Sequence, residues 1–321
     1  MPALLLAAAL LQGCRPQPVP LLRVAANPWP GYEFLFLAES KGFFVDEGVQ
    51  VQLLETLSLA DTRRAFERNQ VDVFAGTVVE VLLSADFSDR KPRVFHVCDY
   101  SAGADVILAR PPVDSVPALK GKRIGIEPAS VNVTLLQLAL VKNGLRLEDV
   151  VAVPLAQNAM PDAVARNNVD AVVSYPPVSM RLLAAGMTLV FDSTSVPGEV
   201  VDVLAADASV LESRRKDIEA LVRAYGRAQQ FADAHPEEAY AIMARREGIS
   251  VDEFKAALQG IRLVRVDEQA VELGQGAAVE RALQLTAKGL LSIKLLGGAP
   301  DLPGLIDYAG VSGVRGNHGS L

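Results

Sequence analysis

The sequence predicts an α/β fold of two lobes, joined by a hinge of two chain crossings, with a ligand cleft between the lobes. Strand and helix patterns alternate along the first two thirds of the 321 residues, which is typical of largely parallel sheets covered by helices. The last third is almost entirely helical in pattern. Half of the residues are hydrophobic and 21% are charged, a composition typical of globular proteins.

Short apolar runs between glycine, proline or polar residues predict the strands. In the first part of the chain these runs are 21–26, 49–54, 71–75, 93–97 and 105–109, with helices predicted over 32–42 and 61–69 and from Thr77 onward. In the second part they are 123–126, 150–153, 171–174, 188–191 and 200–205, with helices predicted over 131–143, 161–167 and 177–185. The helices of the last third are predicted over 209–234, 236–247, 251–260 and 268–289.

The order of these elements predicts that the chain leaves the first lobe and later returns to it. We expect the first lobe to contain residues 21–105 and 206–300, the second lobe residues 106–205, and a tail to follow over 301–321. Two crossings, near 103–109 and 199–206, would form the hinge. Ligands of such sheets bind where the strand-to-helix loops converge, so the loops of both lobes are the predicted site.

In the first lobe these loops carry an aromatic pair and several small or polar residues. Trp29, the only tryptophan, lies in a loop rich in proline and glycine and is closely followed by Tyr32. Such rings can stack on a planar ligand, cover a cation or fill the cleft, although Trp29 could instead plug the rim of a lobe. Gly31, Ser58 and Thr77 are further candidate ligand-binding residues of this lobe.

In the second lobe the candidates are Ser130, Val131 and Asn132, which open a predicted helix, and Tyr175, which could face Trp29. The free N–H groups of a helix N-terminus favour a negatively charged ligand group, although Ser130 could simply cap its own helix. Asp105, near the first crossing, could bind a ligand amine or amide, or could pin the hinge by accepting backbone N–H bonds.

The first 20 residues have the pattern of a lipoprotein signal peptide followed by a proline-rich tether. Residues 3–11 form an apolar run too short to span a bilayer, and Leu11-Gln12-Gly13-Cys14 resembles a bacterial lipobox, in which the cysteine is lipidated. No Lys or Arg precedes the run and Gln12 is unusual at its position, so a plain signal peptide stays an alternative. If Cys14 carries lipid, Cys98 should be a reduced, buried thiol.

Several function classes are disfavoured by the sequence. The net charge of −7 and the lack of a long basic stretch exclude nucleic acid as an expected partner. Two cysteines cannot build a cysteine-based zinc site, and we expect neither a metal nor a cofactor. None of the three histidines lies in a predicted site loop, and no nucleophile elbow or phosphate-binding loop is present. The sequence therefore predicts a binding protein with no catalytic residues rather than an enzyme.

Five segments resemble one known family. The runs Trp29-Pro30-Gly31-Tyr32, residues 38–44 (AESKGFF) and residues 47–51 (EGVQV) look like the N-terminal lobe of the nitrate/sulfonate/taurine-type binding proteins, the NMT1/THI5-like family. Residues 119–125 (LKGKRIG) are similar to the start of that family's second lobe, and residues 169–172 (VDAV) to a later strand. The resemblance covers about residues 22–290. It implies a type II periplasmic-binding-protein fold whose lobes close on a ligand.

The resemblance also implies a function, which we state as an expectation. The protein would be an extracytoplasmic substrate-binding protein of an ABC importer, delivering a small organic molecule to a permease and its ATPase. It would be a monomer, periplasmic or at the cell surface, and held at the membrane only through lipid on Cys14. The expected ligand is sulfonate-like or otherwise acid-bearing. A thiamine-type pyrimidine, an amine-bearing ligand and a ligand-sensing receptor on the same fold are the alternatives.

Overall fold

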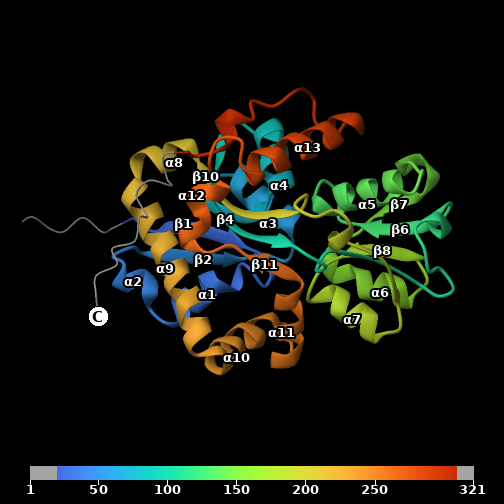
Figure 1. The fold of residues 1–321 in the computed structure, drawn as a ribbon, viewed down its shortest axis with the longest axis horizontal. Helices are drawn as coiled ribbons and strands as arrows, with labels where there is room; N and C mark the ends of the chain where they lie inside the picture. The colour runs from blue at the N-terminus through green and yellow to red at the C-terminus, as the bar shows by residue number, and fades with distance from the viewer. Residues whose placement is uncertain (1–19, 309–321) are drawn as a thin grey trace, which may run out of the picture.

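The computed structural model describes residues 20–308, and these form two sheets with helices on both faces of each (Figure 1). The first sheet contains β1 (Leu22–Ala26), β2 (Val51–Glu55), β3 (Val73–Thr77), β4 (Pro92–Ser101), β10 (Val201–Asp207) and β11 (Ile261–Leu263). The second contains β5 (Val106–Ala109), β6 (Arg123–Ile126), β7 (Val151–Pro154), β8 (Ala171–Ser174) and β9 (Thr188–Asp192). We call the two bodies built on these sheets the first and second lobes.

Both sheets follow one topology. The first has the order β2-β1-β3-β10-β4-β11 and the second the order β7-β6-β8-β5-β9. In each, three parallel strands are followed by an antiparallel strand that enters from the other lobe, β10 in the first sheet and β5 in the second. This pattern confirms the predicted two-lobed α/β fold with two crossings.

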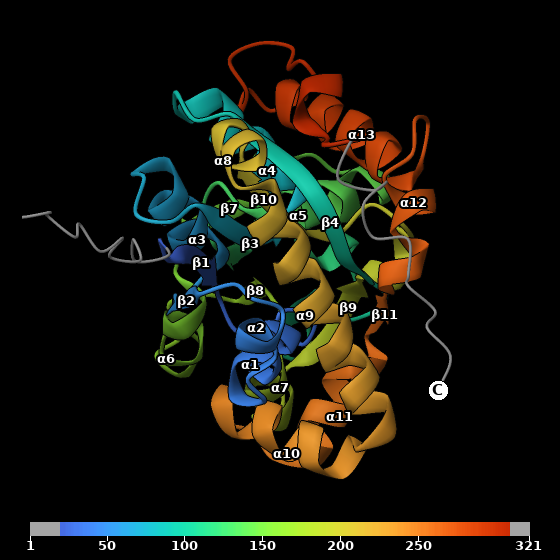
Figure 2. The ribbon, with the colours of Figure 1, turned by 90° about the vertical axis from the view of Figure 1, so that its left-hand side faces the viewer.

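The helices of the first lobe pack in two layers. On one face lie α1 (Glu33–Ser40), α2 (Phe43–Asp46), α9 (Arg215–Ala234), α10 (Pro236–Glu247) and α11 (Val251–Gln259); on the other lie α3 (Leu59–Glu67), α4 (Val78–Phe87) and α13 (Ala278–Ser292). The first lobe also contains two shorter helices, α8 (Ala208–Ser213) and α12 (Gln269–Glu272). Figure 2 shows α9 crossing the outer side of this lobe beside α1 and α2.

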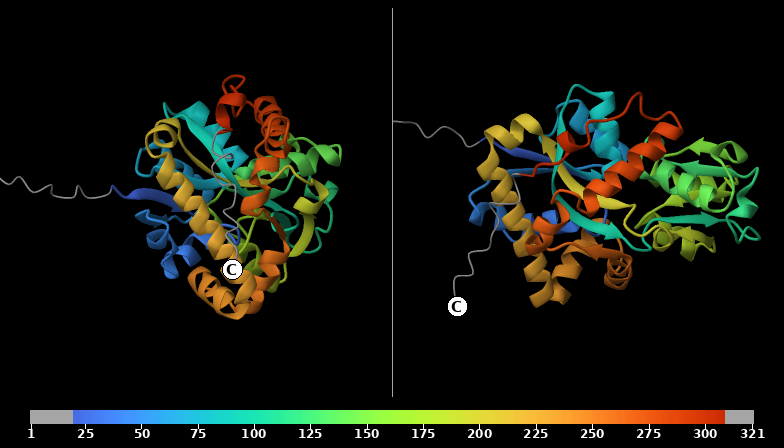
Figure 3. Two further views of the ribbon diagram at one scale, coloured as in Figure 1. Left: turned by 60° about the vertical axis from the view of Figure 1, so that its left-hand side comes forward. Right: turned by 45° about the horizontal axis from the view of Figure 1, so that its top comes forward.

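The second lobe is smaller and lies beside the first along the long axis of the molecule (Figure 3). Its sheet is covered by α5 (Val131–Lys142) on one face and by α6 (Met160–Ala165) and α7 (Val178–Ala184) on the other (Figure 1). The alternation along β5 shows how one strand serves two cores. Ile107 and Ala109 face the main core, whereas Val106 and Leu108 face the core under α6 and α7.

The two crossings are tied together at the hinge. The β4–β5 crossing passes through Ser101, whose hydroxyl lies 2.7 Å from that of Ser193 on the β9–β10 crossing. The hydroxyl of Ser193 also accepts the N–H of Gly103, and Ser101 N–H donates to the carbonyl of Val200. These bonds link the two crossing segments, which makes them one hinge rather than two independent linkers.

Some predicted boundaries are wrong. The predicted return to the first lobe at residue 206 falls inside β10, which already pairs with β4 from Val201 and with β3 from Asp202 onward. The predicted tail also begins too early, because Ile306 bridges to Val94 and Asp307 pairs with Arg215, so residues up to 308 pack on the first lobe. Both boundaries depend on contacts with distant segments of the first lobe, and the periodicity of the sequence carries no information on such contacts.

The helical last third departs from prediction in three places. The predicted helix 209–234 breaks at Arg214 into α8 and α9, and the predicted helix 268–289 is interrupted between α12 and α13 around Gly276, whose φ of +70° does not suit a right-handed helix. A short strand, β11, was not predicted and pairs with β4. It is too short to give a period-2 signal.

Cys98 is buried and free, as predicted. The predicted signal peptide with Cys14, and the end of the predicted tail, lie outside the described residues. Between residues 20 and 308, no helix combines the length and the apolar character that crossing a bilayer requires.

Candidate functional site

The candidate site is a cavity at the hinge, enclosed by side chains from both lobes. It is lined by Asn27, Trp29, Tyr32, Leu59, Thr77, Asp105, Val131, Tyr175 and Asp202. The space that a water-sized sphere can reach between them is about 10 Å³, which is room for no more than about one water molecule. Pockets for drug-sized ligands are larger, about 300–1,000 Å³. The structure is therefore a closed form, and a larger ligand can enter only when the lobes part.

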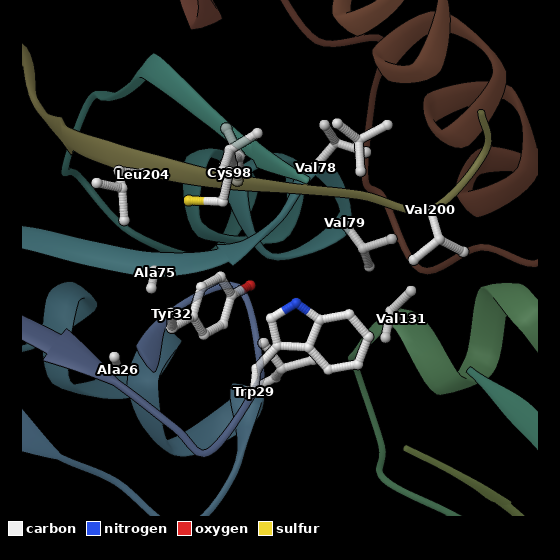
Figure 4. Close-up of a cluster of buried hydrophobic side chains, with 14 of the residues drawn as sticks. Ala26, Trp29, Tyr32, Ala75, Val78, Val79, Cys98, Val131, Val200 and Leu204 are labelled. Carbon is white, nitrogen blue, oxygen red and sulfur yellow. The ribbon is translucent and has the colours of Figure 1, made fainter. Parts of the chain in front are cut away.

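Aromatic side chains dominate the cavity. Trp29 and Tyr32 follow β1 on one loop, with ring centroids 6.4 Å apart. Tyr175 comes from the second lobe, and its ring meets that of Trp29 edge to face at 6.1 Å and 82°. The predicted encounter of Tyr175 with Trp29 is thus confirmed. Figure 4 shows Trp29 beside Val131, at the start of α5, so the indole bridges the two lobes.

The orientation of Trp29 depends on Asp99 and Gly31. The indole N–H donates to both carboxylate oxygens of Asp99 in β4, at 3.1 and 3.2 Å. Gly31 lies against the same carboxylate, because a Cβ added there would be 1.8 Å from Oδ2 of Asp99. The Gly31 carbonyl also accepts the hydroxyl of Tyr225 at 2.7 Å, which fixes the loop from behind. Gly31 therefore supports the cavity but does not line it.

Three buried aspartates gather on the first-lobe side. Asp202 on β10 is the sheet neighbour of Asp99 and accepts the hydroxyl of Tyr32 at 2.5 Å. Burial, the main cause, raises the pKa of Asp99 to about 8, the pKa of Asp105 to about 6, and the pKa of Asp202 well above its usual range. One oxygen of Asp105 and one of Asp202 have no hydrogen-bond partner.

Two glutamates clasp the lobes together across the cavity. Glu80 of α4 receives the side-chain and backbone donors of Thr77 in a capping box, and its other oxygen accepts the N–H of Val131 at the start of α5. Glu127, which follows β6 in the second lobe, accepts the N–H of Ala60 at the start of α3 at 2.8 Å. Each lobe thus places a carboxylate on a helix N-terminus of the other, where the helix dipole favours negative charge.

The clasp is completed by local caps. Ser58 caps α3 and Ser130 caps α5, each through its hydroxyl. The hydroxyl of Tyr175 donates to the second oxygen of Glu127 at 3.3 Å. Burial is the main cause that raises the pKa of Glu127 to about 7. Asn132 points into the second lobe, where its carbonyl oxygen accepts from Glu127 N–H and from the amide of Gln157.

Removing the Glu127 carboxylate should open the molecule. In Glu127→Ala the N–H of Ala60 loses its partner, and an unsatisfied buried donor costs about 1–3 kcal/mol in the closed form alone. We expect a larger radius of gyration by small-angle X-ray scattering. Glu148→Ala, a change at an exposed carboxylate of the same lobe, should leave the radius unchanged. Equal radii for Glu127→Ala and wild type would mean that the clasp does not hold the lobes.

The structure brings most of the predicted site residues to one place. The cavity is lined by Trp29, Tyr32, Thr77, Asp105, Val131 and Tyr175, while Gly31, Ser58, Ser130 and Asn132 lie behind it as supports. Asp105 does tie the two crossings, but through its backbone: its carbonyl accepts the N–H of Ser193 at 3.0 Å and its own N–H donates to the hydroxyl of Ser101. The suggested role of its carboxylate is wrong, because among residues 20–308 no backbone N–H donates to it.

Sequence reasoning missed Asp99 and Asp202, and it did not single out Asn27 or Leu59. Both aspartates lie inside apolar strands, not in strand-to-helix loops, so a search restricted to loops passes over them. A charged residue within an apolar strand was the available signal, because an unpaired buried charge is costly and calls for a reason. Asn27 directly follows β1, and Leu59 is the first residue of α3.

Nothing in the described range is arranged to hold a metal. Over residues 20–308, no three His, Cys, Asp or Glu side chains converge closely enough for one ion. His96 is buried in β4 beside Tyr225, with ring centroids 4.9 Å apart, and it does not line the cavity. The chemistry available in the cavity is therefore aromatic contact, hydrogen bonding and carboxylate charge.

Comparison with known proteins agrees with this architecture. Residues 29–239 match the family described as NMT1/THI5 like. A binding protein of Brucella abortus (strain 2308) is 26% identical over 146 residues, covering 44% of this chain and 46% of the relative. The chain thus aligns with about half the length of that curated relative.

Solved structures share the fold at low sequence identity. The alkanesulfonate-binding protein SsuA from Xanthomonas axonopodis pv. citri, bound to MOPS, superposes with a TM-score of 0.78 and 16% identity over 89% of this chain and 98% of that one. The desulfurization enzyme DSZB superposes with a TM-score of 0.70 and 19% identity over 91% and 97%. Because the family match spans more than half of the chain, this protein belongs to the NMT1/THI5-like family and has the periplasmic-binding-protein fold.

Proposed function

We propose that this protein is the extracytoplasmic substrate-binding component of an ABC importer, and that it captures a small organic molecule without converting it. The observation that carries the proposal is the closed cavity at the hinge, built from both lobes and lined by Trp29, Tyr32 and Tyr175. A site shared between two hinged lobes couples ligand capture to closure, because only the closed form completes the contacts. The family membership supports the same role.

The proposal includes the route of the ligand. The protein acts as a monomer in the periplasm or at the cell surface, where lipid on Cys14 holds it at the membrane. The closed form delivers its ligand to a permease that works with an ATPase. A ligand-sensing receptor would use the same lobes, and a neighbouring permease in the genome distinguishes the importer from it.

The aromatic content of the cavity indicates the kind of ligand. Nitrate or bicarbonate would leave the faces of Trp29 and Tyr175 without an apolar partner, whereas a ring or alkyl chain would cover them. The sequence-based expectation of an acidic group relied on the N-terminus of α5. There, the N–H of Val131 already donates to Glu80, which removes that support.

A thermal-shift screen tests the proposal. Wild-type protein is screened with sulfonates, carboxylates, nitrate, bicarbonate, pyrimidines and amines. A ligand at a hundredfold excess over Kd adds about 2.7 kcal/mol to the stability of the folded state, so one chemical class should raise Tm clearly. In Trp29→Ala the same compound should bind at least tenfold more weakly, since a buried tryptophan is a typical binding hot spot.

The controls separate binding from folding and from catalysis. Phe87→Ala removes a half-exposed aromatic ring that does not line the cavity, and it should keep the wild-type affinity. Turnover of the shifted compound by purified protein would contradict the proposal and favour an enzyme. A uniform absence of shifts across all classes would contradict ligand capture.

A further inference from the structure

The carboxylates around the cavity lack a positive partner. Asp105 and Asp202 line the cavity, each is 2% exposed, and each has one carboxylate oxygen without a hydrogen-bond partner. The side-chain oxygen of Asn27, which also lines the cavity and is 1% exposed, is unpartnered too. Three residues that line one small space therefore each carry an unsatisfied acceptor.

None of the groups that contact these acceptors is positively charged, and the carboxyl of Asp99 also lies within hydrogen-bonding reach of Asp202. Tyr32 donates to Asp202, and Trp29 donates to the adjacent Asp99. Among the described residues that line the cavity there is no Lys, Arg or His. A buried carboxylate without a cation is costly to ionise, and a ligand that brings positive charge would remove that cost.

The helix N-termini that could bind an anion already donate their N–H groups to carboxylates of the protein. The N-terminus of α5 donates the Val131 N–H to Glu80, and the N-terminus of α3 donates the Ala60 N–H to Glu127. Thr77, at the start of α4, gives its hydroxyl and N–H to Glu80 as well. An anionic ligand would have to displace these carboxylates and would then face Asp105 and Asp202.

We infer that the ligand is an organic cation, with an ammonium or amidinium group held between Asp105 and Asp202 and an apolar body packed on Trp29 and Tyr175. This rests on the proposed function and adds the charge of the ligand to it. Ammonium and amidinium groups carry only donors, which matches the unsatisfied acceptors. The faces of tryptophan and tyrosine also attract cations. A metal ion does not fit, because in residues 20–308 no three His, Cys, Asp or Glu side chains converge closely enough to hold one.

The charge of the ligand can be tested with probes of matched shape. Benzylammonium, benzyl alcohol and phenylmethanesulfonate share a benzyl body and differ in charge. Trp29 is the only tryptophan, so its fluorescence reports on the cavity directly. We expect benzylammonium to bind at least tenfold more tightly than benzyl alcohol, and phenylmethanesulfonate to give no response at millimolar concentration.

Variants show whether the carboxylates are responsible. Asp202→Asn and Asp105→Asn keep the shape of the side chain and should each weaken benzylammonium binding at least tenfold while changing benzyl alcohol binding less than twofold. Glu212→Gln removes one negative charge from an exposed helix and should leave both unchanged. Two separate aspartates guard against one variant that fails to fold, and far-ultraviolet circular dichroism checks each.

The outcomes distinguish this inference from the proposed function. Tighter binding of phenylmethanesulfonate than of benzylammonium, or equal binding of all three probes, would overturn the cationic ligand and leave a ligand-capturing protein. Wild-type affinity for benzylammonium in both aspartate variants would overturn it too. If no probe of any charge changes the fluorescence of Trp29, both the inference and ligand capture at this cavity are contradicted.

Discussion

Replacing Gly31 with alanine is expected to destabilise the protein and to abolish ligand binding. The added Cβ would lie 1.8 Å from Oδ2 and 2.9 Å from Cγ of Asp99, which is far inside any allowed contact. Asp99 is fully buried beside Asp202, and the loop that carries Gly31 is fixed by the hydroxyl of Tyr225. Neither the Asp99 carboxylate nor the Gly31 loop can move at low cost. We therefore expect the free energy of unfolding to fall by about 3 kcal/mol, at the upper end of the range for overpacked cores.

The loss of binding has a separate cause. When Asp99 is displaced, the indole N–H of Trp29 loses its acceptor, and the ring no longer keeps its position against Tyr175. Thermal unfolding and Trp29 fluorescence measure the two effects. Gly298→Ala is the matched control, because a Cβ there meets nothing within 4 Å. A Gly31→Ala variant with the wild-type Tm and affinity would show that the Asp99 carboxylate moves freely.

The stability of the ligand-free protein is expected to fall as the pH rises from about 5 to 8. Burial raises the pKa of Asp105 to about 6, that of Glu127 to about 7 and that of Asp99 to about 8. The unfolded chain ionises the same groups near pH 4. Within this window the folded state holds more protons than the unfolded state, so raising the pH favours unfolding. Each such group lowers the free energy of unfolding by about 1.4 kcal/mol per pH unit until the pH passes its pKa in the folded state.

Other groups make the folded protein more stable as the pH rises, and they reduce its stability at acidic pH. Burial lowers the pKa of His96 to about 3, so between about pH 3 and 6.5 the unfolded state binds the extra proton and this group alone favours stability at higher pH. The pKa values of Asp170 and Asp207 are lowered to about 2, so their contribution is lost as the pH falls through about 4 to 2. Since several raised acids oppose one histidine once the unfolded chain ionises them, the maximum should lie near pH 4.

Denaturant unfolding at pH 5 and pH 8 measures this dependence. The free energy of unfolding of the wild type should be smaller at pH 8 than at pH 5. In Asp99→Asn, which lacks the group with a pKa of about 8, it should fall by less over the same interval. Asp114→Asn, at an exposed residue, should follow the wild-type curve. Stability that rises steadily from pH 5 to pH 8 would mean that these carboxyls are ionised in the folded protein.

Local sequence signals were sufficient for most of the elements and for six of the nine residues that line the cavity. Strands β6 and β8 and helix α10 match the predicted ranges, because apolar runs, flanking glycines and a proline at the first helical position are local features. The strand-to-helix loops were also identifiable, which is why Trp29, Thr77 and Tyr175 could be named in advance. Repeated alternation of strand and helix determined the two-lobed fold.

What local signals could not predict are the contacts between segments distant in sequence. Glu80 and Val131 are 51 residues apart, and Trp29 and Asp99 are 70 apart. A helix N-terminus looks like an anion site in the sequence, whereas in the structure a carboxylate of the other lobe occupies it. Pairing across a sheet also decided that β10 belongs to the first lobe.

The sequence by itself therefore determined the fold class, the family resemblance and the loops that form the cavity, because periodicity and turn residues act over a few neighbouring positions. Only the tertiary structure decided the charge of the cavity. Closure of the lobes buries Asp105 and Asp202 without a cation and places Glu80 and Glu127 on the free helix ends, and burial of charge depends on which distant segments meet.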